Sequence, residues 1–170
     1  MPKLKTPPKR KPMKRVVGID PGAKGAAVLL AEGEVQDYIR FTKYTDREIL
    51  DRFETWAHPC GALIPCYLEK VSSAPGQGVA SVFKFGVSYG KMQAMVMATG
   101  MRLEFVTPKK WLAATGVPKV GVKGQRGFTK NTAEKKKATR ERAQQLYPGI
   151  SLTTDVWDAL MIAHYGWLQR

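Results

Sequence analysis

The side chains best suited to chemistry are carboxylates at the ends of predicted strands and at the start of a predicted helix: Asp20, Glu69, Asp155 and Asp158. Carboxylate oxygens are the ligands that hard cations such as Mg²⁺ and Mn²⁺ prefer. Two such ions about 4 Å apart can activate a water and stabilise the leaving oxygen of a phosphodiester. The sequence offers no Ser-His-Asp or Cys-His set as a competing chemistry.

Each of these carboxylates also has an ordinary structural interpretation. Asp20 precedes Pro-Gly, where an aspartate often only caps a turn. Glu69 lies in a predicted interior strand, where a buried carboxylate needs a metal, a proton or a basic partner. Asp155 and Asp158 are three residues apart, so we expect both on one side of the first turns of a helix. Asp155 there would also interact favourably with the helix dipole, whereas Asp158 precedes the apolar run ALMIA.

The charge of the chain favours an anionic partner. Its 170 residues include 28 Lys and Arg against 14 Asp and Glu, a net charge of +14. The partner expected is either nucleic acid or an acidic membrane surface. The membrane is the less favoured of the two, because no apolar run reaches the roughly 18 residues that spanning requires and no basic helix shows a wide aromatic or Leu face.

Two segments concentrate this positive charge. Residues 1–15 carry seven basic residues, four prolines and no acid, which predicts a disordered arm, either solubilising or phosphate-binding. Residues 116–137 carry seven basic residues and four glycines, which predicts a flexible basic loop at about 116–131. The remaining residues, 16–170, are predicted to form one domain.

Apolar periodicity predicts an α/β fold with a mixed five-stranded sheet flanked by helices. Two strands form a hairpin that turns near Glu32–Gly33, and the sheet begins with three antiparallel strands and continues with parallel ones joined by right-handed crossovers. The expected helices cover residues 46–57, 79–99, 107–116 (with Thr107 as its cap), 132–147, and 154 to the end of the chain.

Six segments occur in an order that resembles the RuvC-type Holliday-junction resolvases: GIDPG at 18–22, LEKV at 68–71, FKFGVSYGKMQA at 83–94, VTPKKW at 106–111, KKATRERAQQLYP at 136–148 and DVWDALMIAHYG at 155–166. The resemblance spans residues 16–168. VTPKKW and RAQQLYP are more similar to the phage and chloroplast branches than to the typical bacterial enzyme.

The resemblance implies a ribonuclease-H-like fold and a homodimeric endonuclease of DNA recombination and repair. Such enzymes resolve four-way junctions by paired nicks that depend on Mg²⁺ or Mn²⁺, with two ions per active site. It implies that the four carboxylates named above form the catalytic, metal-binding set. It also matches Lys136 to a lysine near the scissile phosphate, although a solvated charge between its lysine neighbours is the alternative.

Two further groups of residues follow from this interpretation. Phosphate contacts are expected from basic residues in and around the basic loop and the first strand end: Lys24, Lys119, Lys123, Arg126, Lys130, Lys135 and Lys137. Gly86 and Gly90, four residues apart on a predicted helix, leave a flat strip. The resemblance assigns this strip to the dimer interface, and close contact with the chain's own sheet is the alternative.

Other functions remain open at this stage. A nuclease of broader range, acting on flaps and other branched DNA, or a non-catalytic nucleic-acid-binding protein on the same fold would share these features. An actin-like or sugar-kinase-type phosphotransferase would need a second phosphate loop and a much longer chain. Cys60 and Cys66 are expected to be reduced, and no secretory signal is evident, which predicts an intracellular, cytoplasmic protein (in the nucleoid or a phage-infected host), with an organelle as the alternative.

Overall fold

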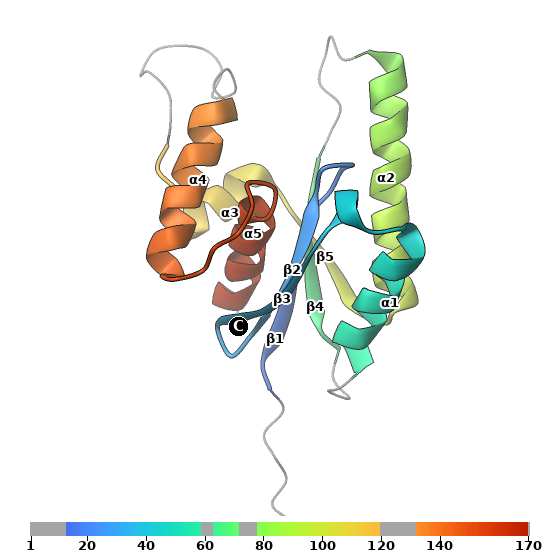
Figure 1. The fold of residues 1–170 in the computed structure, drawn as a ribbon, viewed down its shortest axis with the longest axis horizontal. Helices are drawn as coiled ribbons and strands as arrows, with labels where there is room; N and C mark the ends of the chain where they lie inside the picture. Colours follow the sequence, from blue (N-terminus) through green and yellow to red (C-terminus); the bar gives the residue numbers. More distant parts are fainter. Residues whose placement is uncertain (1–12, 59–62, 72–77, 120–131, 170) are drawn as a thin grey trace, which may run out of the picture.

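The protein is built on one mixed sheet. The structure, a computed structural model, describes residues 13–58, 63–71, 78–119 and 132–169. Its five strands lie in the order β3-β2-β1-β4-β5 (Figure 1). They are β1 (Arg15–Asp20), β2 (Ala26–Ala31), β3 (Glu34–Arg40), β4 (Pro65–Glu69) and β5 (Arg102–Val106). The first three pair antiparallel, whereas β4 is parallel to both β1 and β5, so the predicted sheet is confirmed.

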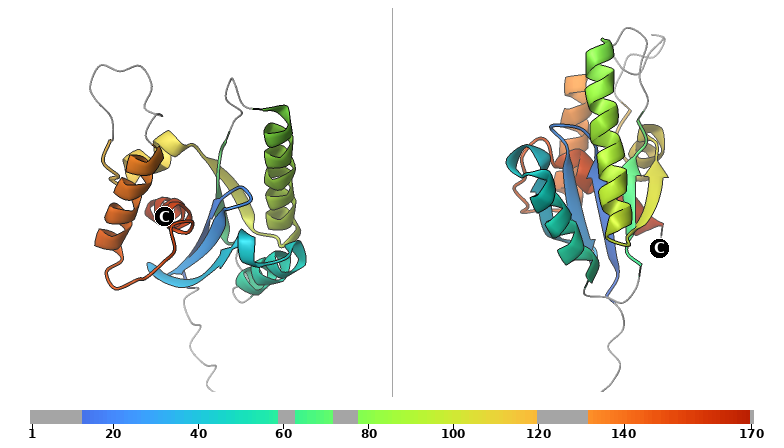
Figure 2. Two further views of the ribbon diagram at one scale, coloured as in Figure 1. Left: turned by 45° about the horizontal axis from the view of Figure 1, so that its top comes forward. Right: turned by 90° about the vertical axis from the view of Figure 1, so that its right-hand side faces the viewer.

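Helices cover both faces of the sheet (Figures 1 and 2). One face carries α1 (Asp46–Ala57) and α2 (Val79–Ala98), which follow the short 3-10 turn η1 (Phe41–Lys43) in the chain. The other face carries α3 (Pro108–Ala114), α4 (Thr132–Leu146) and α5 (Trp157–Leu168). Alternate residues of each strand therefore enter two separate apolar clusters, one on each side.

Close packing holds α5 directly on β1. A Cβ atom at Gly18 would lie 2.2 Å from the backbone nitrogen of Ala163, and one at Gly166 would lie 2.3 Å from Cδ2 of Tyr67. Neither position has room for a larger residue, because backbone and a ring already fill the space. The two glycines therefore fix the height of α5 on the sheet, and with it the position of the residues in its first turn.

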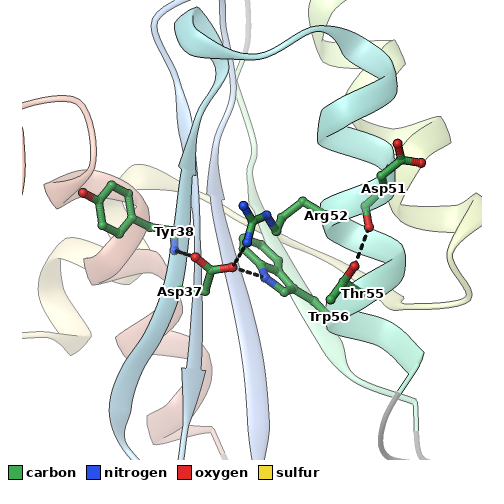
Figure 3. A network of polar contacts seen from close by, with 6 residues as sticks. All are labelled: Asp37, Tyr38, Asp51, Arg52, Thr55 and Trp56. Atoms are coloured by element: carbon green, nitrogen blue, oxygen red, sulfur yellow. Dashed lines mark hydrogen bonds and ion pairs between the residues drawn. The ribbon is translucent and has the colours of Figure 1, made fainter.

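A polar network joins β3 to α1 on the opposite face (Figure 3). Asp37 Oδ2 accepts hydrogen bonds from Arg52 Nη1 at 2.9 Å and from Trp56 Nε1 at 2.8 Å. Trp56 is buried in the core, so its indole N–H needs this acceptor. The network fixes β3 against the helix and leaves the alternate residues of β3 to face α5.

The boundaries of the two basic segments differ from the prediction where the structure describes them. Arg15 already belongs to β1, and the Lys14 backbone N–H donates to Glu32 Oε1 at 2.6 Å, so the ordered strand begins before residue 16. Residues 1–12 lie outside the described part of the chain. At the second segment, Val117 is buried in the core, while residues 120–131 also lie outside the described residues.

Within the described ranges, the structure contains no helix both long and apolar enough to cross a membrane. Cys66 is a free, buried thiol whose pKa burial raises, and Cys60 lies outside the described residues.

Candidate active site

Three carboxylates from three elements approach one another at one end of the sheet. Asp20 ends β1 and Glu69 ends β4, and these strands are parallel neighbours with Ile19 paired to Leu68. Carboxyl ends of parallel strands meet at one edge of a sheet, which places the two acids together. Asp158 joins them from the first turn of α5.

The electrostatics of the group indicate that the three side chains lie close to one another. Burial raises the pKa of Asp20 to about 8, and the neighbouring charges of Asp158 and Glu69 contribute to this rise. Burial also raises the pKa of Glu69 and that of Asp158. Carboxylates that share a poorly solvated site repel one another when ionised. When the three acids are ionised, the surrounding protein therefore does not fully compensate their negative charge.

Two lysines of α4 supply part of the compensation. The charges of Lys136 and Lys135 lower the pKa of Asp20 and that of Asp158, against the effect of burial. A hydrogen bond with the buried hydroxyl of Thr139, one turn further along α4, also lowers the pKa of Asp158. Lys136 is exposed beside the acids, so a bound anion could reach it; its predicted contact with the scissile phosphate stays a prediction.

Glu69 has a partner that the sequence interpretation missed. Trp111 of α3 is fully buried and donates from Nε1 to Glu69 Oε1 at 2.8 Å. The ammonium of Lys135 lies 5.4 Å from the centroid of the Trp111 ring, within the range of a cation–π contact. Thr107 caps α3 as predicted, accepting from the Lys110 N–H at 3.4 Å. A buried indole N–H requires an acceptor, so the tryptophan in this short predicted helix was the one sign in the sequence that Glu69 could have such a partner.

Asp155 pairs with an arginine in this structure, and its predicted place in the metal-binding set stays a prediction. The helix α5 begins at Trp157 rather than near 154, so Asp155 lies in the preceding turn and not on the first helical turn with Asp158. Its Oδ2 atom pairs with Arg40 Nη2 at 2.5 Å.

The donor atoms suit a divalent cation, but they do not form a closed coordination site in this arrangement. Among the described residues, no three His, Cys, Asp or Glu side chains are placed to hold one metal ion. The three central acids are nevertheless all-oxygen donors with uncompensated charge, which is the chemistry that Mg²⁺ and Mn²⁺ require. A cation there would need side-chain movements that bring Asp20, Glu69 and Asp158 onto it.

The residues predicted to contact DNA are only partly described. Lys24 and Lys119 are exposed, and Lys137 is exposed with its Nζ atom 3.9 Å from Glu141 Oε1. Lys135 lies by the acids rather than on an open surface. Lys123, Arg126 and Lys130 lie outside the described residues.

Gly86 and Gly90 face away from the sheet. A Cβ atom at either position would meet nothing within 4 Å, so the alternative of close contact with the chain's own sheet is wrong. Exposed apolar side chains lie on the same helix: Val79, Phe83, Val87 and Met97. We call these four residues and the two glycines the α2 stripe.

Comparisons with known proteins find a likeness in fold. No family model matches the chain, and no curated protein matches its sequence. Among solved structures, RuvC of T. thermophilus in complex with a Holliday junction substrate superposes with a TM-score of 0.53 at 14% identity, over 89% of this chain and 91% of that one. A second Thermus thermophilus RuvC structure gives a TM-score of 0.52 at 15% identity, over 89% and 92% of the two chains. The predicted similarity to the phage and chloroplast branches stays a prediction. The chain thus has the RuvC-like, ribonuclease-H-like α/β fold that its sequence predicted.

Proposed function

We propose that this protein is a metal-dependent endonuclease that nicks branched DNA, with four-way junctions as its principal substrate. The observation that carries the proposal is the group of three mutually repelling, poorly solvated carboxylates at the ends of β1 and β4 and the start of α5. A protein of net charge +14 that concentrates uncompensated acid at one point is suited to hold cations against a polyanion.

The residues around the acids have distinct tasks in this proposal. Bound Mg²⁺ or Mn²⁺ would supply the activation of water and the stabilisation of the leaving oxygen. Asp20, Glu69 and Asp158 would hold the ions, and Trp111 orients the carboxylate of Glu69 through its hydrogen bond. Lys136 and Lys135 reduce the negative charge of the site, so that a phosphate can approach it.

The second part of the proposal is a homodimer formed through the α2 stripe. Val79 is 86% exposed and Phe83 71% exposed, which is costly for large apolar side chains in water. Gly86 and Gly90 of the same stripe would let a second helix approach closely. A two-fold assembly also gives two active sites, as paired nicks in a four-way junction require.

The dimer is tested by a substitution that leaves the isolated chain unstrained. Gly90→Leu places a side chain in open space within one chain but at the proposed contact with its partner. We expect sedimentation to report a monomer for Gly90→Leu and a dimer for the native chain, with equal helical content. A native chain that sediments as a monomer at micromolar concentration would refute this part of the proposal.

The catalytic proposal is tested by nicking of labelled junction, flap and linear duplex in Mg²⁺, Mn²⁺ or EDTA. Junction nicking should require a cation and fall at least about a hundredfold in Asp20→Asn, Glu69→Gln and Asp158→Asn, as expected when a group in the reacting site is removed. Asp51→Asn, on the surface of α1 and thus on the other face of the sheet, is the matched control and should nick as the native protein does. Cation-dependent nicking that persists in Asp20→Asn would refute the assignment.

One observation favours a second candidate, a nucleic-acid-binding protein without catalysis. The fourth carboxylate is engaged by Arg40, and the described acids do not close around an ion. Such a protein would bind junctions equally well in EDTA, would not nick under any cation, and would be stabilised by Asp20→Asn without loss of function. A gel-shift assay beside the nicking assay separates the two candidates.

A further inference from the structure

The ion pair between Arg40 and Asp155 stands beside the acid group in the fold. Ala26 on β2 pairs with Asp20 on one side and with Arg40 on the other, so the three residues lie in a row across β1, β2 and β3. Directly opposed residues of antiparallel strands point to the same face. Arg40 therefore extends over the face that carries α5, at the same end of the sheet as the acids, and meets Asp155 there at 2.5 Å.

The guanidinium of Arg40 binds Asp155 through only one of its nitrogen atoms. Arg40 uses Nη2 for Asp155, while its buried Nε finds no hydrogen-bond partner among the described residues. A well-formed arginine–carboxylate pair commonly uses two parallel N–H donors, and a buried donor without a partner is unfavourable. Both side chains keep 26% of their surface exposed. The pair thus restrains Asp155 by one contact that another cation can replace.

From these contacts we propose that Arg40 is a positioning residue that holds Asp155 away from the acid group and so weakens the binding of divalent cations. The inference rests on the proposed function, because it assumes that cations bind at Asp20, Glu69 and Asp158. An ion that recruits Asp155 as an additional ligand must first displace the guanidinium. Arg40 and the ion then compete for one carboxylate, which sets the cation concentration at which the site fills.

The size of the effect follows from the exposure of the pair. Ion pairs at the surface contribute up to about 1 kcal/mol, which corresponds to roughly a fivefold change in an equilibrium constant. Removing the guanidinium should therefore tighten cation binding by about fivefold. Arg40→Lys keeps a positive charge and should stay near the native affinity, which separates the ion pair from simple loss of the side chain.

The test is calorimetric titration of Mn²⁺ into the full-length protein without DNA. We expect Arg40→Gln to bind Mn²⁺ more tightly, and the gain to vanish in the double variant Arg40→Gln with Asp155→Asn. Arg52→Gln is the matched control, since Arg52 makes an equivalent pair with Asp37 at 2.9 Å on the other face of the sheet. Thermal melts of each variant confirm that it is folded.

The outcomes are decisive. Unchanged or weaker binding in Arg40→Gln overturns the inference, as does a gain that persists without the Asp155 carboxylate, because Arg40 would then act only through its charge. If Asp158→Asn abolishes Mn²⁺ binding while Arg40→Gln has no effect, this inference fails and the proposed function stands. If the native protein, Arg40→Gln and Arg52→Gln all fail to bind Mn²⁺ and to nick junctions, both fail together.

Discussion

The carboxyl group of Asp20 is costly to ionise in the folded protein, and Asp20→Asn should remove that cost. The pKa of Asp20 rises from 3.8 to about 8, first through burial and then through the charges of Asp158 and Glu69. The folded state therefore keeps a proton that the unfolded chain releases. It follows that the contribution of Asp20 to the free energy of unfolding is largest below about pH 4 and is lost as the pH rises toward about 8.

The magnitude follows from the same shift. At pH 7 the unfolded chain gains about 4 kcal/mol by releasing this proton, since each pKa unit corresponds to about 1.4 kcal/mol. Movement of the site and entry of water reduce the cost, so we expect Asp20→Asn to stabilise the protein by about 2–4 kcal/mol at pH 7. For a chain of this size, that is an increase in Tm of roughly 5–15 °C.

The measurement is thermal unfolding of both proteins from pH 4 to pH 8 in EDTA. The difference in Tm should be close to zero at pH 4 and grow with pH, and Mg²⁺ or Mn²⁺ at pH 7 should raise the Tm of the native protein more than that of Asp20→Asn. Asp51→Asn, whose carboxylate is half exposed on α1, is the control and should show no such growth with pH. A difference that does not change with pH, or a less stable Asp20→Asn protein at pH 7, would refute the electrostatic reasoning.

Three other substitutions or truncations test separate parts of the structure. Trp111→Phe removes the donor to Glu69 and should slow junction nicking by about tenfold while the protein remains folded, because partners of this kind typically contribute about tenfold or more. Gly18→Ala should destabilise the protein by about 3 kcal/mol or more in urea titrations, because its Cβ would overlap the α5 backbone. Residues 1–12 carry five basic residues, so removing them should weaken the salt dependence of junction binding. The slope of log K against log salt should become shallower by about 0.9 for each phosphate that these residues neutralise. An unchanged slope would mean that they neutralise none.

Local sequence patterns were sufficient to predict most elements of the fold. The helix predicted over 46–57 is observed over the same residues, because Ile49, Phe53 and Trp56 repeat at helical spacing and are buried, and Thr45 forms a capping box with Glu48. The convergence of the acids at the ends of β1 and β4 was also predictable, since parallel neighbouring strands bring their carboxyl ends together. In both cases the information lies within one element or between adjacent strands.

Contacts between distant elements were not predictable in the same way. The hydrogen bond from Trp111 to Glu69 joins residues 42 positions apart in the chain, and it depends on how α3 packs against the end of β4. The hydrogen bond between Thr139 and Asp158 depends likewise on how α4 is positioned along α5. Residue type indicates that a buried indole or hydroxyl needs a partner, but only the packing of helices on the sheet decides which partner it finds.

The position of Arg40 depends on a single irregularity in the hairpin. Counted from the turn at Glu32–Gly33, a regular hairpin would place Ile39 opposite Ala26 and direct Arg40 toward α1. The register instead shifts between Leu29 and Leu30, which leaves one extra residue in β3 and places Arg40 opposite Ala26. A shift of one residue exchanges the two faces of a strand, so Ile39 packs beneath α1 and Arg40 reaches Asp155, 115 positions away in the chain. The residues around Asp155 in the sequence favour a helix start, whereas the arginine that pairs with it is supplied by the bulge in β3, on another strand.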